Sequence, residues 1–102
     1  MEDEKMIAVT AQNFISEENI PKFLEMVKEL IEKTKQEKGC IEYKLYREKH
    51  NPEIFCLIEK WETAHDLKVH FLSEHFMRIV PEIDKIKIAK DVVNIYEEIE
   101  NI

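Results

Sequence analysis

Histidine and tryptophan are the scarce side chains through which this sequence could do chemistry: it has four histidines and one tryptophan. A histidine inside a small apolar fold can act as a general base, because its unperturbed pKa lies near 6.5. A core histidine bonded to backbone is the favoured alternative from composition alone. His70 and His75 stand on a predicted helix, where they diverge by roughly 140° at about 100° per residue. That divergence is poor geometry for two ligands of one metal ion, so we expect no metal site.

A second grouping on the same predicted helix involves acidic residues. Asp66, His70 and Glu74 share one face at i, i+4 and i+8. One histidine and two carboxylates could hold a metal ion, but solvated side chains with a hydrogen bond inside the helix are the favoured interpretation. On the core side of the helix we expect Leu67 and Phe71, with His70 at the border of that side.

Two further polar groups lie on predicted strands. Asn13 stands on a strand whose two faces both carry apolar residues, where an unbonded amide is costly, so it either bonds a turn or lines a pocket. Trp61 closes a strand just before Thr63, which is predicted to cap the following helix. Packing in the core or an interface is its ordinary role, although its N–H can also bond a ligand. We expect Asn13, Trp61, His70 and His75 to meet at one cavity between the sheet and the second helix.

The two cysteines, Cys40 and Cys56, do not form a CxxC pair. If the strands that carry them pair around the turn between them, the two residues lie roughly 20 Å apart at 3.3 Å per residue, which excludes an intrachain disulfide. No base or helix N-terminus is placed to activate either thiol. Both are therefore predicted to be buried small apolar residues in a reducing compartment.

Composition excludes several classes of function. The chain has 102 residues, with 22 acidic against 15 basic side chains and a net charge of -7. This balance argues against nucleic acid and anionic membranes as partners. A single glycine excludes the Gly-rich phosphate loops, so no nucleotide cofactor is expected. The apolar runs are too short to cross a bilayer and the acidic start is no secretory signal, so a cytoplasmic protein is expected.

The elements that must position these residues follow the order strand, helix, strand, strand, helix, strand. Hydrophobic periodicity and turn residues predict strands at 6–14, 40–48, 54–62 and 88–96, and helices at 20–38 and 63–74. A second helical piece begins near Ser73 and is ended or bent by Pro81. This order predicts one α+β domain over residues 1–102, a ferredoxin-like βαββαβ fold with a four-stranded antiparallel sheet and two main helices. Residues 1–5 and 98–102 are predicted to be frayed.

The third predicted strand is apolar on both faces. One face carries Ile54, Cys56 and Ile58, and the other carries Phe55, Leu57 and Trp61. Two helices can cover only one face of a four-stranded sheet, so we expect the second face to pack on an identical chain in a two-fold homodimer. A monomer whose open face is covered by the tail or by a ligand is the alternative.

Three motifs connect the sequence to a known family. Residues 39–45 read GCIEYKL, residues 59–63 read EKWET, and residues 70–76 read HFLSEHF. They fit the patterns G-C-x-x-Y-x-L, E-x-W-x-[ST] and H-x-x-[ST]-x-H-F at the expected spacing. The chain thereby resembles the antibiotic biosynthesis monooxygenase (ABM) domain family, which includes quinol monooxygenase-like members, over nearly its whole length.

The resemblance implies a dimeric α/β barrel with a pocket between sheet and helices in each subunit. It also implies a cofactor-independent monooxygenase that acts with O2 on a small electron-rich aromatic or quinol substrate. The protein then supplies a dry cavity, hydrogen bonds to the substrate anion, and orientation. The implied site residues are Asn13 and Trp61 for substrate oxygen atoms or dioxygen, His70 or His75 for the proton, and Tyr43, Phe71 and Phe76 for substrate binding.

The resemblance leaves other functions open, because the family also contains haem degraders, isomerases and proteins without activity. The haem-degrading branch places a tryptophan where His70 stands and a haem-binding histidine near Val80, so haem degradation is disfavoured. A non-catalytic dimeric module that binds a small ligand is one alternative to the monooxygenase. An isomerase-type relative that uses a histidine as acid and base on a sugar-like substrate is the other.

Overall fold

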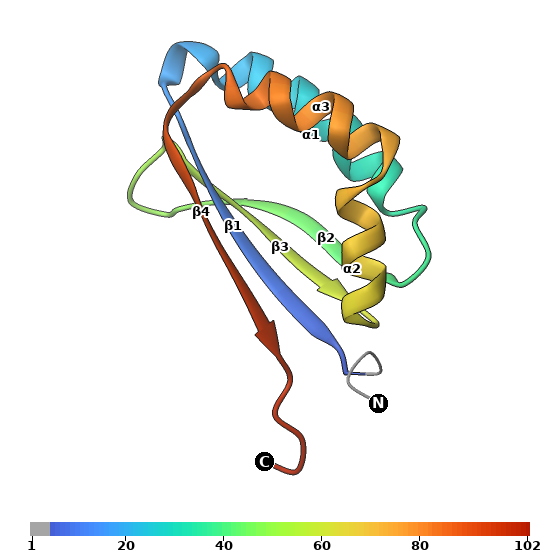
Figure 1. The fold of residues 1–102 in the computed structure, drawn as a ribbon. Coiled ribbons are helices and arrows are strands. Elements are labelled where there is room, and N and C mark those ends of the chain that lie inside the picture. Colours follow the sequence, from blue (N-terminus) through green and yellow to red (C-terminus); the bar gives the residue numbers. More distant parts are fainter. Residues whose placement is uncertain (1–4) are drawn as a thin grey trace.

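The computed structural model describes residues 5–102 of the chain as one antiparallel sheet with helices on one face (Figure 1). The strands are β1 (Ile7–Ile15), β2 (Cys40–Arg47), β3 (Ile54–Trp61) and β4 (Lys87–Glu97), in the sheet order β2-β3-β1-β4. The helices are α1 (Ile20–Thr34), α2 (Ala64–Phe71) and α3 (Glu74–Asp84), with a short 3-10 turn, η2 (Glu17–Asn19), ahead of α1. The ferredoxin-like prediction is confirmed.

The register of the sheet decides which residues face the helices. β1 pairs with β3 so that Ile7 lies opposite Trp61 and Asn13 lies opposite Phe55. Because residues directly opposite one another share a face, the odd-numbered residues of both strands point to the same side. On β3 these are the buried residues, whereas the even-numbered residues between them are only half-buried. The core therefore lies between this face and the helices.

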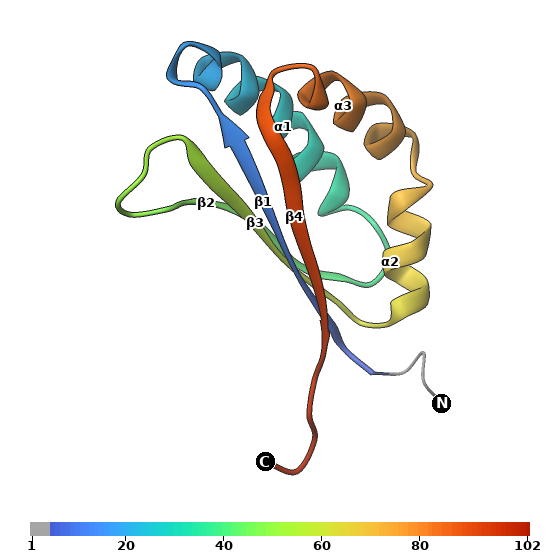
Figure 2. The same cartoon turned by 60° about the vertical axis from the view of Figure 1, so that its left-hand side comes forward.

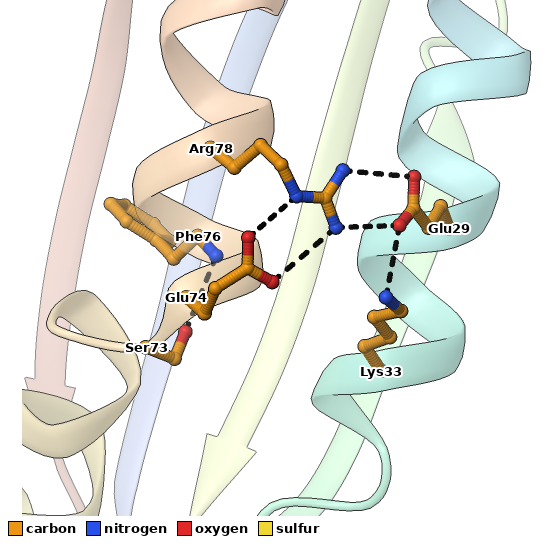
Figure 3. Close-up of polar contacts among 6 residues, drawn as sticks. All are labelled: Glu29, Lys33, Ser73, Glu74, Phe76 and Arg78. Carbon is orange, nitrogen blue, oxygen red and sulfur yellow. Dashed lines mark hydrogen bonds and ion pairs between the residues drawn. The ribbon is translucent and has the colours of Figure 1, made fainter.

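Helices α1 and α3 lie side by side across the sheet, and α2 sits at the end where β3 finishes (Figures 1 and 2). The exposed side of the α1–α3 contact carries an ion-pair network (Figure 3). Arg78 on α3 donates to Glu29 on α1 at 2.6 Å and to Glu74, one turn earlier on α3, at 2.6 Å. Lys33 reaches the same Glu29 carboxylate at 3.1 Å. This network is a link between the two helices on their solvent side.

The first helix ends earlier than predicted. α1 stops at Thr34 instead of continuing to residue 38, and Gly39 lies beyond it in the turn that leads into β2. Gly39 has a φ of 83°, a conformation that glycine adopts without strain. A Cβ atom there would lie 2.1 Å from Oδ2 of Asp66. The glycine is thus required by a tight contact between this turn and α2, and it does not cap α1.

The second helical region is two helices with a break between them, and the second one begins at Ser73 as predicted. Thr63 caps α2 as expected, since its hydroxyl accepts from the Asp66 N–H at 3.0 Å. α2 then ends at Phe71, and Ser73 begins α3 by accepting from the Phe76 N–H at 3.3 Å. Pro81 does not end α3, which continues to Asp84. Pro81 leaves the carbonyl of Met77 without its helical donor, and Met77 is one of the exposed residues of α3.

The outer face of the sheet remains open in the single chain. It carries the half-buried Ile54, Cys56 and Ile58 of β3, together with the exposed Val92 and Tyr96 of β4. β3 carries apolar residues on both faces as predicted, but only the face toward the helices is buried, whereas the outer face is half-buried. Of the segments predicted to fray, residues 1–4 lie outside the described residues, and Glu98–Ile102 follow the end of β4. No helix of the described chain is long and apolar enough to span a membrane.

Candidate active site

A cavity lies between the sheet and the helices. Its volume is about 90 Å³, which leaves space for a few water molecules. Its walls are largely apolar, and they include Phe23, Leu30, Tyr43, Leu57, Phe71 and Phe76. Four polar residues also reach it, namely Asn13, Glu59, Lys87 and Asp91. An apolar pocket with a few convergent polar groups is the ordinary form of a small-molecule site.

Glu59 is the acidic group buried in this cavity wall. The alternation of β3 turns it inward with Leu57 and Trp61, and it is only 4% exposed. Burial raises the pKa of its carboxyl to about 7, and the charge of Glu37 adds to that increase. The Trp61 Nε1–H, which donates to Glu59 Oε1 at 3.0 Å, opposes it. A carboxyl that titrates near neutrality can both take and return a proton.

The other polar end of the cavity lies further along β1. Glu59 pairs with Val9, and Asn13 is four residues beyond it, which is roughly 13 Å at 3.3 Å per residue. Asn13 is 5% exposed, and its Nδ2 donates to the Ala11 carbonyl at 3.1 Å. At this end Lys87 donates to Asp91 Oδ2 at 2.7 Å, while Asp91 Oδ1 is buried and has no hydrogen-bond partner within the described part of the chain. The cavity thus has two polar ends joined by apolar walls.

The two histidines of the H-x-x-[ST]-x-H-F motif meet at one carboxylate. His70 Nδ1 lies 2.6 Å and His75 Nε2 lies 2.7 Å from Oε2 of Glu37. Both ring nitrogens can donate to this oxygen, which only accepts. Glu37 comes from the turn after α1, whereas the histidines come from α2 and α3. These three residues are called the Glu37 cluster below.

His70 is enclosed by aromatic rings. Its ring centroid lies 4.8 Å from that of Trp61, 5.0 Å from that of Phe76 and 5.4 Å from that of Tyr43. The residue is fully buried, and burial lowers the pKa of its imidazole, whereas the hydrogen bond that the ring donates to Glu37 acts to raise that pKa. Its Nε2 is buried and has no hydrogen-bond partner among residues 5–102. Because Phe76 and Tyr43 also line the cavity, His70 stands one layer behind the cavity wall.

The helical-wheel prediction for this region is partly wrong. Leu67 is buried as expected, but Phe71 is 37% exposed while His70 is buried completely. The predicted divergence of the two histidines assumed one continuous helix. The break at Ser73 redirects the chain, so the ring nitrogens converge on Glu37 instead. The alternative set of Asp66, His70 and Glu74 does not gather, because Glu74 pairs with Arg78 on the surface.

The predicted site residues divide into two groups. Asn13, Tyr43, Phe71 and Phe76 line the cavity, whereas Trp61, His70 and His75 do not. Asn13 and Trp61 share a face of the sheet, but they are six residues apart in register, roughly 20 Å.

Sequence reasoning missed the two carboxylates that organise these groups. Glu59 could have been found, because it interrupts the inward-facing apolar series of β3. Glu37 carries no local signal, since it stands in a polar turn.

The cysteines lie apart, as predicted from the strand pairing. Cys40 is opposite Trp61, and Cys56 is opposite Tyr46. Both are free thiols. Burial raises the pKa of Cys40 to about 11 and also raises that of Cys56, so neither thiol is activated as a nucleophile.

Together, the βαββαβ sheet, the helices on one face and the polar-ended apolar cavity define a ferredoxin-like α+β domain with an internal cavity. Within that class the chain belongs to the antibiotic biosynthesis monooxygenase family, whose family model matches residues 6–82. The resemblance carried by the three sequence motifs is confirmed.

Solved structures share both the fold and a substantial part of the sequence. A conserved protein from Methanosarcina mazei Go1 is 36% identical with a TM-score of 0.89, covering 91% of this chain and 92% of that one. A crystal structure of an antibiotic biosynthesis monooxygenase is 35% identical with a TM-score of 0.86, covering 91% of this chain and 98% of that one.

One relative is similar in sequence over a shorter stretch of the chain. The Bacillus subtilis (strain 168) protein YjcS is 31% identical over 61 residues, which is 60% of this chain and 58% of YjcS.

Proposed function

We propose that this protein is a cofactor-independent monooxygenase that acts with O2 on a small electron-rich aromatic or quinol. The observation that carries the proposal is Glu59, a carboxyl with a pKa of about 7 in the wall of an apolar cavity. Family membership and the 35% identity to an antibiotic biosynthesis monooxygenase support the reaction class.

The chemistry begins with a proton. A phenolic hydroxyl gives its proton to the Glu59 carboxylate, and the resulting anion passes an electron to O2. Recombination forms a C–O bond on the ring, and cleavage of the O–O bond releases water. One oxygen atom enters the substrate, and the other leaves with the two hydrogens that the substrate loses, so a quinol becomes a hydroxyquinone. An apolar cavity favours this sequence because it excludes the water that would otherwise solvate the anion.

The remaining site residues bind and position. Asn13, with the neighbouring Asp91 Oδ1, offers hydrogen bonds to an oxygen at the far end of the substrate, while Tyr43, Phe71 and Phe76 pack against its ring. Trp61 acts as a positioning residue through its hydrogen bond to Glu59. His70 is the second candidate for the base, because its unpartnered Nε2 lies among rings that line the cavity. His75 would act with it through Glu37.

The test is a panel of quinols and catechols with an oxygen electrode and product mass spectrometry. Turnover that consumes O2 and adds one oxygen atom supports the proposal. Glu59→Gln should then lower kcat by roughly 10²–10⁴, while the exposed Glu62→Gln serves as the matched control. A loss confined to His70→Gln would transfer the base role to that residue. Binding without turnover would favour the ligand-binding module, and isomerisation without O2 uptake would favour the isomerase.

We also propose that the protein works as a homodimer in the cytoplasm. The open outer face, with Ile58, Val92 and Tyr96, supports a partner chain, and the free thiols suit a reducing compartment. Light scattering at micromolar concentration should give about twice the chain mass of 12.3 kDa. Ile58→Asp should dissociate or unfold the dimer, because an unpaired buried charge costs several kcal/mol. A mass of one chain would overturn this assembly.

A further inference from the structure

We infer that Glu37, His70 and His75 form a binding site for a divalent transition-metal ion of the zinc type. The three candidate ligand atoms all lie within 4.8 Å of one another. They are an imidazole Nδ1, an imidazole Nε2 and a carboxylate oxygen, the donor types that Zn²⁺ takes in proteins. The inference does not depend on the proposed oxygenase activity, since the cluster stands outside the residues that line the cavity.

The present distances are close to those of a metal centre. Tetrahedral Zn²⁺ with ligands at about 2.0–2.2 Å keeps neighbouring ligand atoms about 3.3–3.5 Å apart. Glu37 Oε2 now lies 2.6 Å and 2.7 Å from the two ring nitrogens. Binding therefore needs the carboxylate oxygen to withdraw from each nitrogen by less than about 1 Å, and the two ring nitrogens, which lie within 4.8 Å of one another, to take the same spacing of about 3.3–3.5 Å.

The cluster is held in place by the fold around it. His70 is fixed between the rings of Trp61 and Phe76, and the Ser73 hydroxyl donates to the His70 carbonyl at 2.7 Å where α2 gives way to α3. Glu37 is anchored by its carbonyl, which accepts from the Cys40 N–H at 3.2 Å. Three ligands from three separate segments are thus presented without a folding step, which lowers the cost of binding.

The site also has a route for the ion and a place for the displaced proton. The side chains of Glu37 and His75 are each 13% exposed, whereas that of His70 is 1% exposed. An ion can therefore reach the cluster from the Glu37 and His75 side. When His70 Nδ1 binds the metal, the ring proton moves to Nε2, which is buried among aromatic rings that accept N–H groups weakly. Two histidines and one glutamate leave a fourth position for water or another ligand.

Isothermal titration of the full chain with Zn²⁺ at fixed pH tests the inference. One ion per chain is expected, and Glu37→Gln and His75→Ala should each weaken binding by at least 10-fold. His65→Ala, which removes an exposed histidine outside the cluster, should leave binding unchanged. Circular dichroism of each variant separates loss of the site from loss of the fold.

Cobalt provides the second measurement. Co²⁺ in this site should give the visible absorption of four-coordinate geometry without a sulfur charge-transfer band. A sulfur band would move the site to Cys40 and overturn the inference, as would affinity weaker than millimolar or affinity that Glu37→Gln and His75→Ala leave intact. Oxygen uptake by the chelator-treated protein reports on the proposed function separately, because that reaction uses no metal.

Discussion

The cavity wall and the Glu37 cluster bury a carboxylate in two different ways. Glu59 sits on a central strand and is 4% exposed, and the described residues give its side chain one donor, the Trp61 indole. Glu37 sits in a turn, keeps 13% of its side chain exposed and accepts from two imidazoles at a single oxygen. Because a single hydrogen bond does not offset the burial of Glu59, its pKa is raised to about 7. Glu37 instead binds one imidazole from each of two helices.

The difference shows that the number of donors around a buried acid decides what the acid can do. A carboxyl with a single donor in an apolar wall lies close in free energy to its protonated form, which suits proton transfer. A carboxylate that accepts hydrogen bonds from two imidazoles, as Glu37 does from His70 and His75, fixes the orientation of both rings. The two roles arise from the same residue type on the same side of one sheet, so variants at each can be compared directly.

The largest expected effect on stability comes from removing the ring at the centre of the Glu37 cluster. His70→Ala should lower the free energy of unfolding by about 4 kcal/mol, because it leaves a cavity the size of a buried aromatic ring between Trp61 and Phe76. Urea unfolding measures the change. His65→Ala is the control, since His65 is exposed and should change stability by less than about 0.5 kcal/mol. Equal losses in both variants would contradict the role given to the cluster.

Glu59→Gln should act in the opposite direction. The folded state holds a proton on Glu59 that the unfolded chain releases between pH 4.5 and about 7, so stability falls as the pH rises through that window. The amide removes this loss, and the variant should exceed the wild type by about 3 kcal/mol at pH 8 and match it near pH 4.5. Denaturant midpoints at the two pH values check this. A constant difference across pH would mean that Glu59 is not the titrating group.

Trp61→Phe tests the same comparison between Glu59 and Glu37, because it removes the indole N–H that donates to Glu59. The Nε1–H lowers the pKa of Glu59, so its loss should raise that pKa further above 7 and shift the pH window upward. At pH 8 the variant should lose about 2 kcal/mol, the order of a hydrogen bond to a charged group, and less at pH 5. Stability against pH in the Glu59→Gln background is the control, because the pH-dependent part of the loss should disappear there.

The smallest effect is expected at the surface network of Arg78 (Figure 3). Its partners Glu29 and Glu74 are exposed, so solvent and salt screen the attraction between them. Arg78→Gln should lower the melting temperature only slightly, and the difference should shrink as salt is added. Melting curves at low and high ionic strength measure it. If Arg78→Gln lowered the melting temperature as much as His70→Ala does, the surface ion pairs would contribute more to the packing of α1 on α3 than the core does.

The sequence alone determined the fold and the family, because both follow from local patterns. The apolar residues on both faces of β3 were visible in its sequence, Thr63 predicted the start of α2, and the order of strands and helices along the chain predicted the sheet. Glu59 was also within reach, since a carboxylate among inward-facing apolar residues is visible from periodicity. Asn13, Tyr43, Phe71 and Phe76 were found through motifs and family pattern, and all four line the cavity.

Only the tertiary structure decided how the histidines are used. A wheel that continues the predicted helix of residues 63–74 to residue 75 separates His70 from His75, whereas the helix that begins at Ser73 turns His75 back toward Glu37. Glu37 itself stands 33 residues before His70, in a turn whose course depends on the tight contact between Gly39 and Asp66. The meeting of these three side chains depends on helix packing across the whole sheet. A pattern of spacing within one segment cannot encode it, because the partners come from three segments.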